Sequence, residues 1–175
     1  MDWPTDLRPA SLKQPDGVSC GPTSVVAARM LLEPTWRPAD LAAEIARTHR
    51  RLTSIRDGAG GSQLPWPRAL GTPPWAVARV LSRLSGQPVG PMLARRRPEA
   101  AYDELVRRVA TRPVAVYLGS RWLPRHVVLA FAATGDATAV RVFDPARAEL
   151  VTVANGRWRR HEVGVAGWSH FWAVV

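Results

Sequence analysis

The sequence is poor in cysteine and in lysine. It contains one cysteine, Cys20, in 175 residues, so it can form neither an internal disulfide nor a zinc site of the multi-cysteine kind. Lys13 is the only lysine among 24 basic residues, and the formal net charge of +10 therefore comes almost entirely from arginine. Such a skew is typical of GC-rich coding bias, which weakens the charge as a sign of function. A basic chain still permits an acidic partner or nucleic acid.

Long apolar segments and a leader pattern are also missing. No run approaches the roughly 20 apolar residues of a membrane helix, so we expect no membrane span. Residues 1–6 have no basic region followed by an apolar stretch, so we expect a cytoplasmic protein or one exported by a signal-independent route. Hydrophobic residues make up 46% of the chain, enough for an ordinary core. The length fits a single domain over 1–175.

The pattern predicts helices first and strands afterwards. A helix follows Cys20, with Pro22 in its first turn and Pro34 as its stop. Apolar spacing predicts further helices over 38–49, 75–85 and 98–111, separated by a long irregular loop at 50–74. Short strands are predicted over 114–118, 126–133, 139–144, 149–154 and 170–175. This order predicts an α+β fold, with a helical half packed on an antiparallel sheet.

Cys20 lies where a thiol can be activated. A helix N-terminus carries partial positive charge and unpaired N–H groups, and both favour a thiolate, which is the reactive form of cysteine. Gly21 would let a substrate carbonyl approach the backbone closely. Taken alone, Cys20 fits a structural role, as a helix cap or a small buried residue, about as well as it fits a nucleophile.

His126 and Asp144 can supply the rest of a catalytic set. His126 opens a predicted strand, and Asp144 ends the next strand, 18 residues later. A turn at 134–138 would pair the two strands as a hairpin and bring Asp144 beside His126. The carboxylate could then hold the imidazole in one tautomer while the other ring nitrogen serves the thiol. Asn155 is the next candidate for this third position.

The order of these motifs resembles the papain-like cysteine peptidases, and more closely their C39-like group. The resemblance rests on Gln14 with Cys20-Gly21-Pro22-Thr23, on 112–116 and 126–129, and on Asp144-Pro145. It covers roughly residues 12–155, although 50–97 matches no part of the pattern and Arg125 stands where the family commonly has a small residue. The resemblance implies a papain-like fold and a catalytic set of Cys20, His126 and Asp144. It also implies that the Gln14 amide and the Cys20 backbone N–H form an oxyanion hole.

We therefore expect a cysteine peptidase or amidase that needs no cofactor or metal and acts on a peptide or protein. An acyl-transferring or deamidating enzyme, similar to a transglutaminase, would use the same site, and either enzyme could be a toxin or effector. A binding module for peptides or nucleic acid is the alternative of another class, since the stretch 157–160 combines arginine with tryptophan. The sequence leaves the oligomeric state open.

Several other polar residues have weaker claims. His49 is predicted at a solvated helix end, His161 on an exposed strand or loop, and His170 among aromatic residues of a core or interface. Three acids rank below Asp144 as partners for the histidine, namely Asp57, Asp103 and Asp136. Trp66 and Trp75 flank the long loop and could line a groove, although packing is the safer expectation.

Overall fold

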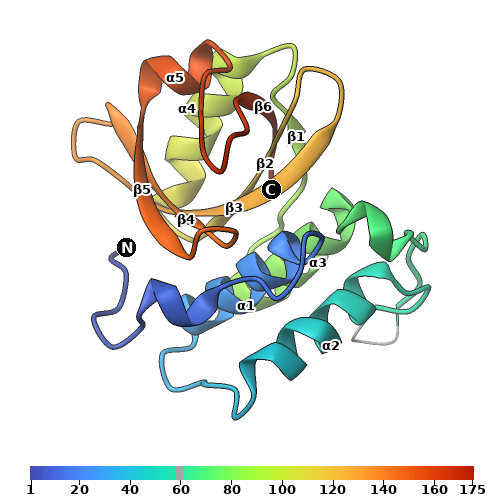
Figure 1. Cartoon of the computed structure of the whole chain (residues 1–175). Coiled ribbons are helices and arrows are strands. Elements are labelled where there is room, and N and C mark those ends of the chain that lie inside the picture. Colours follow the sequence, from blue (N-terminus) through green and yellow to red (C-terminus); the bar gives the residue numbers. More distant parts are fainter. Residues whose placement is uncertain (58–60) are drawn as a thin grey trace.

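Helices and strands occupy different sides of the molecule. In the computed structural model, α1 (Cys20–Leu32), α2 (Leu41–Thr53) and α3 (Pro74–Ser85) lie together below the sheet as Figure 1 is drawn. The later helices α4 (Pro98–Val109) and α5 (Asn155–Arg159) lie with the strands on the other side. The combination of helices with an antiparallel sheet confirms the expected α+β class.

The sheet curves around α4 and α5. In the described part of the chain it has six strands, paired antiparallel in the order β1-β6-β2-β3-β4-β5. The strands are β1 (Met92–Leu93), β2 (Val114–Gly119), β3 (Pro124–Ala133), β4 (Ala139–Asp144), β5 (Glu149–Ala154) and β6 (His170–Val174). Figure 1 shows α4 and α5 inside the curve and α1 beneath β3, so β2 and β3 are covered on both faces.

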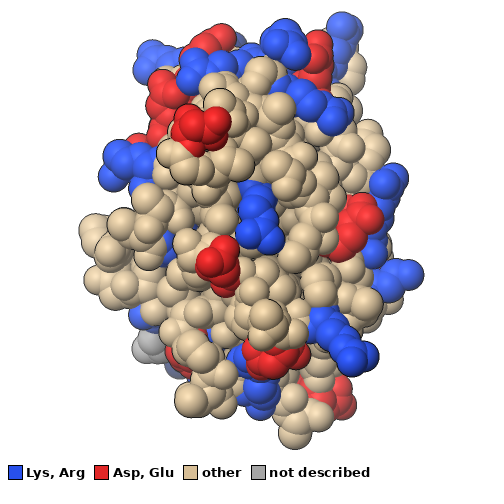
Figure 2. Space-filling view, turned by 90° about the vertical axis from the view of Figure 1, so that its left-hand side faces the viewer, with Lys and Arg blue, Asp and Glu red and all other residues tan. Residues whose placement is uncertain are grey.

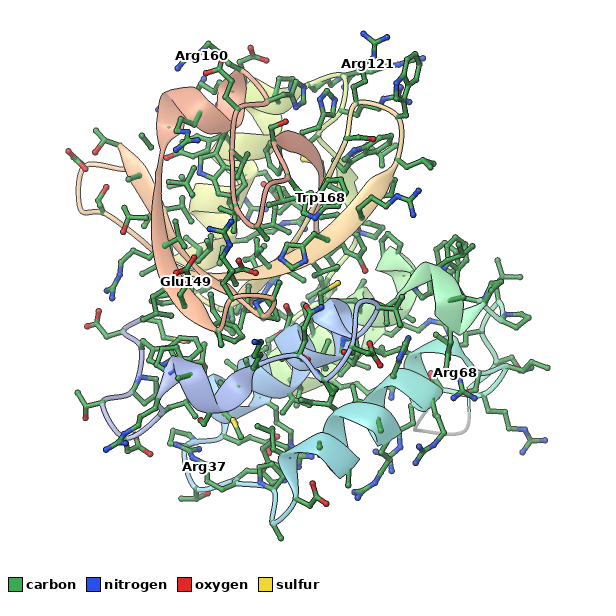
Figure 3. All side chains as sticks on the ribbon, viewed as in Figure 1. Arg37, Arg68, Arg121, Glu149, Arg160 and Trp168 are labelled. Carbon is green, nitrogen blue, oxygen red and sulfur yellow. The ribbon has the colours of Figure 1, made fainter. Side chains whose placement is uncertain are left out.

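Two apolar cores lie on opposite faces of this sheet. Successive side chains of a strand point to opposite faces. Thus Tyr117 and Leu129 join the core shared with α1, α2 and α3, whereas Val116 and Val128 join the core around α4 and α5. Figure 3 shows side chains filling both spaces. Burial on both faces explains why these two strands are nearly continuous apolar sequence.

Most predicted elements are present, with shifted ends. Strands β4 and β5 have the predicted bounds, and α1 ends as expected. Helix α2 begins at Leu41 rather than Pro38, because the carboxylate of Asp40 caps it by accepting a hydrogen bond from the Ala43 N–H at 2.9 Å. Strand β3 begins at Pro124, two residues before His126.

The basic stretch before His161 is helical, although we expected this part of the chain to be an exposed strand or loop; His161 itself lies in a turn. Residues 155–159 form α5, and Trp158 in this helix is fully buried. Its ring packs edge-on against Phe171 at 5.1 Å, and its Nε1 donates to the carbonyl of Val153 at 3.2 Å. A five-residue helix with one apolar side chain has no periodicity to reveal it. The two-residue strand β1 was missed for the same reason.

The loop predicted at 50–74 is shorter than expected, because α2 continues to Thr53 and α3 begins at Pro74. The structure describes residues 1–57 and 61–175, so the glycines of this loop at 58 and 60 lie outside the described residues. The described part contains the short 3-10 helix η2 (Arg68–Leu70). Before α1, the lead-in contains a second such turn, η1 (Pro9–Leu12).

Basic and acidic side chains are intermingled on the surface. On the face drawn in Figure 2, Lys and Arg side chains lie among Asp and Glu, and side chains of both signs also lie near the middle of a largely tan surface. Many arginines are held in ion pairs, such as Arg159 with Asp103 at 2.6 Å and Arg160 with Glu162 at 3.0 Å. Within 1–57 and 61–175, no helix is long and apolar enough to cross a membrane.

Candidate active site

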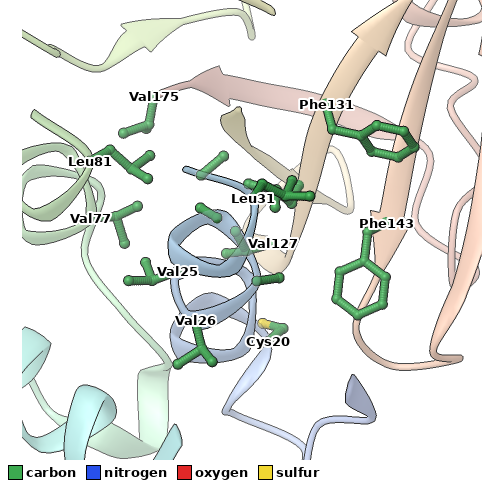
Figure 4. Close-up of a cluster of buried hydrophobic side chains, with 14 of the residues drawn as sticks. Cys20, Val25, Val26, Leu31, Val77, Leu81, Val127, Phe131, Phe143 and Val175 are labelled. Atoms are coloured by element: carbon green, nitrogen blue, oxygen red, sulfur yellow. The ribbon is translucent and has the colours of Figure 1, made fainter. Parts of the chain in front are cut away.

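Cys20 is the first residue of α1. Ser19 is the N-cap and makes no side-chain capping bond, so unpaired N–H groups remain at this end of the helix. Pro22 occupies a position where its missing N–H costs nothing. Figure 4 shows Cys20 at the start of the helix, with the apolar side chains of α1 and α3 further along. The thiol is thus held at the positive end of a rigid, buried helix.

Strand β3 places His126 against this helix end. The Ser24 hydroxyl in the first turns of α1 donates to the carbonyl of Val127 at 3.4 Å. This contact joins the helix to the residue that follows His126, and both Cys20 and His126 are buried, with 5% and 4% of their surface exposed. Cys20 does lie among apolar side chains, but His126 lies on the same side and interacts with it.

The hairpin of β3 and β4 brings Asp144 to His126. Leu129 pairs with Phe143, and the end of β4 therefore returns beside the start of β3. The Nε2 of His126 lies 2.7 Å from the Oδ1 of Asp144, the hydrogen bond expected from the sequence. The same oxygen accepts from the Ala146 N–H at 3.0 Å, and the whole side chain is buried. With Nε2 bound to the carboxylate, Nδ1 is left for the thiol.

The surroundings of His126 favour its charged form. Burial on its own lowers the pKa of this histidine, but hydrogen bonds to Asp144 and to the Cys20 side chain raise it more, and the resulting pKa is about 9. His126 therefore carries a proton at neutral pH. A cationic imidazole between a carboxylate and a thiol stabilises the thiolate.

Gln14 lies beside Asp144-Pro145 but does not line the groove. Its backbone N–H donates to the carbonyl of Pro145 at 2.9 Å, which holds it beside the end of β4. Its side-chain Nε2 donates to the carbonyl of Asp16 at 2.6 Å, and its Oε1 is buried without a hydrogen-bond partner. One amide hydrogen is thus used locally instead of pointing into the cleft as expected. The oxyanion role of Gln14 stays a prediction.

A groove of about 610 Å³ runs past Cys20 and His126 between the two halves. Apolar side chains dominate its walls. Val18, Trp66, Ala69, Leu70 and Pro74 come from the helical side, and Leu123, Pro124, Val127 and Trp168 come from the sheet side. Figure 3 places Trp168 in the loop before β6, on the sheet side of the boundary with the helices.

Thr72 and Tyr117 were not singled out in the sequence, yet both line the groove. The Tyr117 hydroxyl donates to the carbonyl of Thr72 at 3.1 Å, and burial raises the pKa of this tyrosine, so it remains neutral. Trp66 lines the groove as considered, whereas Trp75 packs edge-on against Trp66 at 5.3 Å outside the lining. The residues that form this wall come from separate segments of the chain, so no sequence motif could have predicted them.

The other histidines lie elsewhere. His49 is buried rather than solvated, because α2 extends a turn further and packs its ring near the Gly71 carbonyl at 3.4 Å. His161 lies in a turn after α5 and stacks on His170, with 3.8 Å between ring centroids. His170 therefore does have an aromatic neighbourhood, as expected.

No other predicted acid or amide competes with Asp144 for His126. Asp57 pairs with Arg83 at 2.5 Å, and Asp103 pairs with Arg159. Asp136 accepts from the hydroxyls of its own turn, and Asn155 accepts from Arg159 at 2.5 Å. In the described ranges, no three His, Cys, Asp or Glu side chains are grouped so that they could hold a metal ion.

Comparison with known proteins gave no matching protein-family model, no matching curated protein and no matching solved structure. The function must therefore be argued from the geometry of the groove itself.

Proposed function

We propose that this chain is a papain-like cysteine hydrolase, similar to the C39-like group, which cleaves a peptide or isopeptide-type amide. One observation carries the proposal. His126 binds Asp144 through Nε2 at 2.7 Å while its ring also interacts with the thiol of Cys20. A nucleophile, a base and an orienting acid in mutual contact, at the wall of a groove, form the arrangement that covalent catalysis requires.

The reaction begins from the thiolate–imidazolium pair. The sulfur of Cys20 attacks the substrate carbonyl, and the carbonyl oxygen becomes an oxyanion near the unpaired N–H groups at the start of α1. The proton on Nδ1 of His126 passes to the leaving nitrogen, the C–N bond breaks, and a thioester remains on Cys20. Neutral His126 then takes a proton from water, whose oxygen attacks the thioester and releases the acid. Asp144 holds the ring in place throughout.

Acyl transfer or deamidation would share the first half of this sequence. An amine would replace water in acyl transfer, and the leaving group would be ammonia in deamidation. The groove does not separate these outcomes, because the thioester on Cys20 is common to all three.

The nucleic-acid alternative has less support. Trp158 is fully buried and so cannot stack on a base, and its neighbours Arg159 and Arg160 are in ion pairs. The face in Figure 2 likewise has acidic groups among its arginines. A function confined to peptide binding would not require the contact between His126 and Asp144.

The test is product analysis with a complex mixture of peptides. Mass spectrometry of the mixture separates new termini, amide-to-acid conversion and transfer to an added primary amine. We expect one of these products with the wild-type protein and none with Cys20→Ala. Products that form equally with Cys20→Ala would contradict the proposal. So would an unchanged mixture combined with a Cys20 thiol of ordinary reactivity.

A further inference from the structure

Arg125 is the only side chain of permanent charge in the described lining of the groove, and no Asp or Glu accompanies it there. We infer that Arg125 determines specificity by binding a carboxylate of the substrate, next to a bulky apolar residue held by the groove walls. The inference rests on the proposed function, since it names the substrate class for the same site. Many arginines of this chain are exposed, and what distinguishes Arg125 is where it is placed.

A β-bulge aims Arg125 into the groove. Next to β2, His126 pairs with Leu118 and Pro124 pairs with Gly119, so Arg125 is the extra residue between two successive pairs. In a regular strand, neighbouring residues point to opposite faces, and Arg125 would lie on the other side from His126. The bulge changes this alternation, and both residues line the groove.

Gly119 makes this bulge possible. A Cβ at this position would lie 2.1 Å from the carbonyl oxygen of Leu123 and 2.8 Å from the Cα of Pro124. Backbone atoms cannot yield as a flexible side chain can, so only glycine allows the chain to pass so closely. The placement of Arg125 is therefore built into the backbone.

Arg125 has no partner within the described chain. Its side chain is exposed, and no carboxylate of the described residues lies within ion-pairing distance of it. The charge of His126 is offset by its ion pair with Asp144, which is buried behind the ring. The groove therefore keeps one uncompensated positive charge, and a negatively charged group is its natural complement.

The apolar walls of the groove indicate which side chain the substrate has beside its carboxylate. Leu70 from the helical side and Leu123 from the sheet side both line the groove, with 63% and 53% of their surface exposed. Trp66 and Trp168 add two aromatic surfaces. A large aliphatic or aromatic side chain would cover this apolar surface. The substrate class is thus an acidic peptide with a bulky apolar residue close to the cleaved bond.

The first test needs no known substrate. Cys20 is alkylated with iodoacetate, which is anionic, and with iodoacetamide, which is neutral, and the ratio of the two rates is the readout. We expect Arg125→Gln to lower the ratio about twofold to fivefold, the upper part of the range for an exposed ion pair, and Arg125→Glu to lower it further. Arg121→Gln is the matched control, because Arg121 belongs to the same hairpin, stacks on Trp122 and lies outside the groove lining.

The second test uses paired peptides that differ only by Glu or Gln, each with a free or an amidated C-terminus. The four peptides separate a side-chain carboxylate from a terminal one as the source of the charge. Wild type should favour the carboxylate through a lower KM, and Arg125→Glu should favour a lysine peptide instead. An alkylation ratio that is unchanged in Arg125→Gln, or equally lowered in Arg121→Gln, would overturn the inference. These outcomes would leave the proposed function intact. Failure of the proposed function would show separately, as an iodoacetamide rate that His126→Ala does not change.

Discussion

The replacement of Asp144 by asparagine should change activity in a way that depends on pH. Asparagine keeps the shape of the side chain and can still accept from Nε2, but it removes the negative charge that stabilises the cation of His126. The wild-type pKa of His126 is about 9, against an ordinary value of 6.5. At about 1.4 kcal/mol for each pKa unit, this difference corresponds to about 3 kcal/mol of preference for the charged form.

The expected loss of activity in Asp144→Asn follows from the fraction of His126 that is protonated at each pH. If the pKa falls to about its ordinary value, the protonated fraction at pH 8 falls roughly thirtyfold, whereas at pH 6 it changes little. In the proposed reaction His126 donates a proton to the leaving nitrogen, so kcat/KM should show the same contrast. The folded state also gains stability from the raised pKa. This contribution is fully present below pH 6.5 and is lost as the pH rises through about 9.

The assay is the pH profile of kcat/KM for wild type and Asp144→Asn, with an NMR titration of the His126 ring that needs no substrate. Asp103→Asn is the control, since this acid pairs with Arg159 far from the groove. Asp144→Ala should also lower activity less than Cys20→Ala, because an orienting group is not the nucleophile. An equal loss at pH 6 and pH 8, or a wild-type ring that titrates near pH 6.5, would refute this reasoning.

Two further substitutions test the neighbourhood of the thiol. If the Gln14 amide turns from the Asp16 carbonyl toward a developing oxyanion, Gln14→Ala should reduce turnover roughly 10²–10³-fold. Alkylation of Cys20 by a haloacetamide should stay nearly unchanged. A loss of both rates, or of neither, would show that Gln14 is misassigned. Gly21→Ala would place a Cβ 1.8 Å from the Thr72 hydroxyl oxygen and should cost about 1–3 kcal/mol in urea unfolding, with a smaller cost in a Thr72→Ala background. Equal costs in the two backgrounds would argue against that contact.

The contact of His126 with Asp144 and the place of Cys20 at a helix start could be predicted because local rules place each residue. Pro22 and Pro34 mark the ends of α1, and a turn between two apolar strands fixes the hairpin that joins His126 to Asp144. The spacing therefore predicted the contact, although it could not show that the register of β3 with β4 shifts between Ala130 and Ala132.

The groove could not be predicted in the same way. Trp168 reaches it from a loop that follows α5, and no local pattern links this residue to Leu70 or Thr72. The aim of Arg125 depends on the bulge opposite Gly119, which arises only when β2 and β3 pair. His49 was misjudged because its burial is set by the packing of α2 against the loop at Gly71. Long-range contacts decide all of these features.

The central claim is that His126 activates Cys20, and the rate of alkylation of Cys20 by iodoacetamide tests it most directly. Wild type and His126→Ala are compared at pH 7, with His170→Ala as the control, since His170 stacks on His161 and lies outside the groove lining. The account predicts fast labelling in wild type and in the control, and at least tenfold slower labelling in His126→Ala, approximately the rate of an ordinary thiol. Equal rates in all three proteins would contradict it.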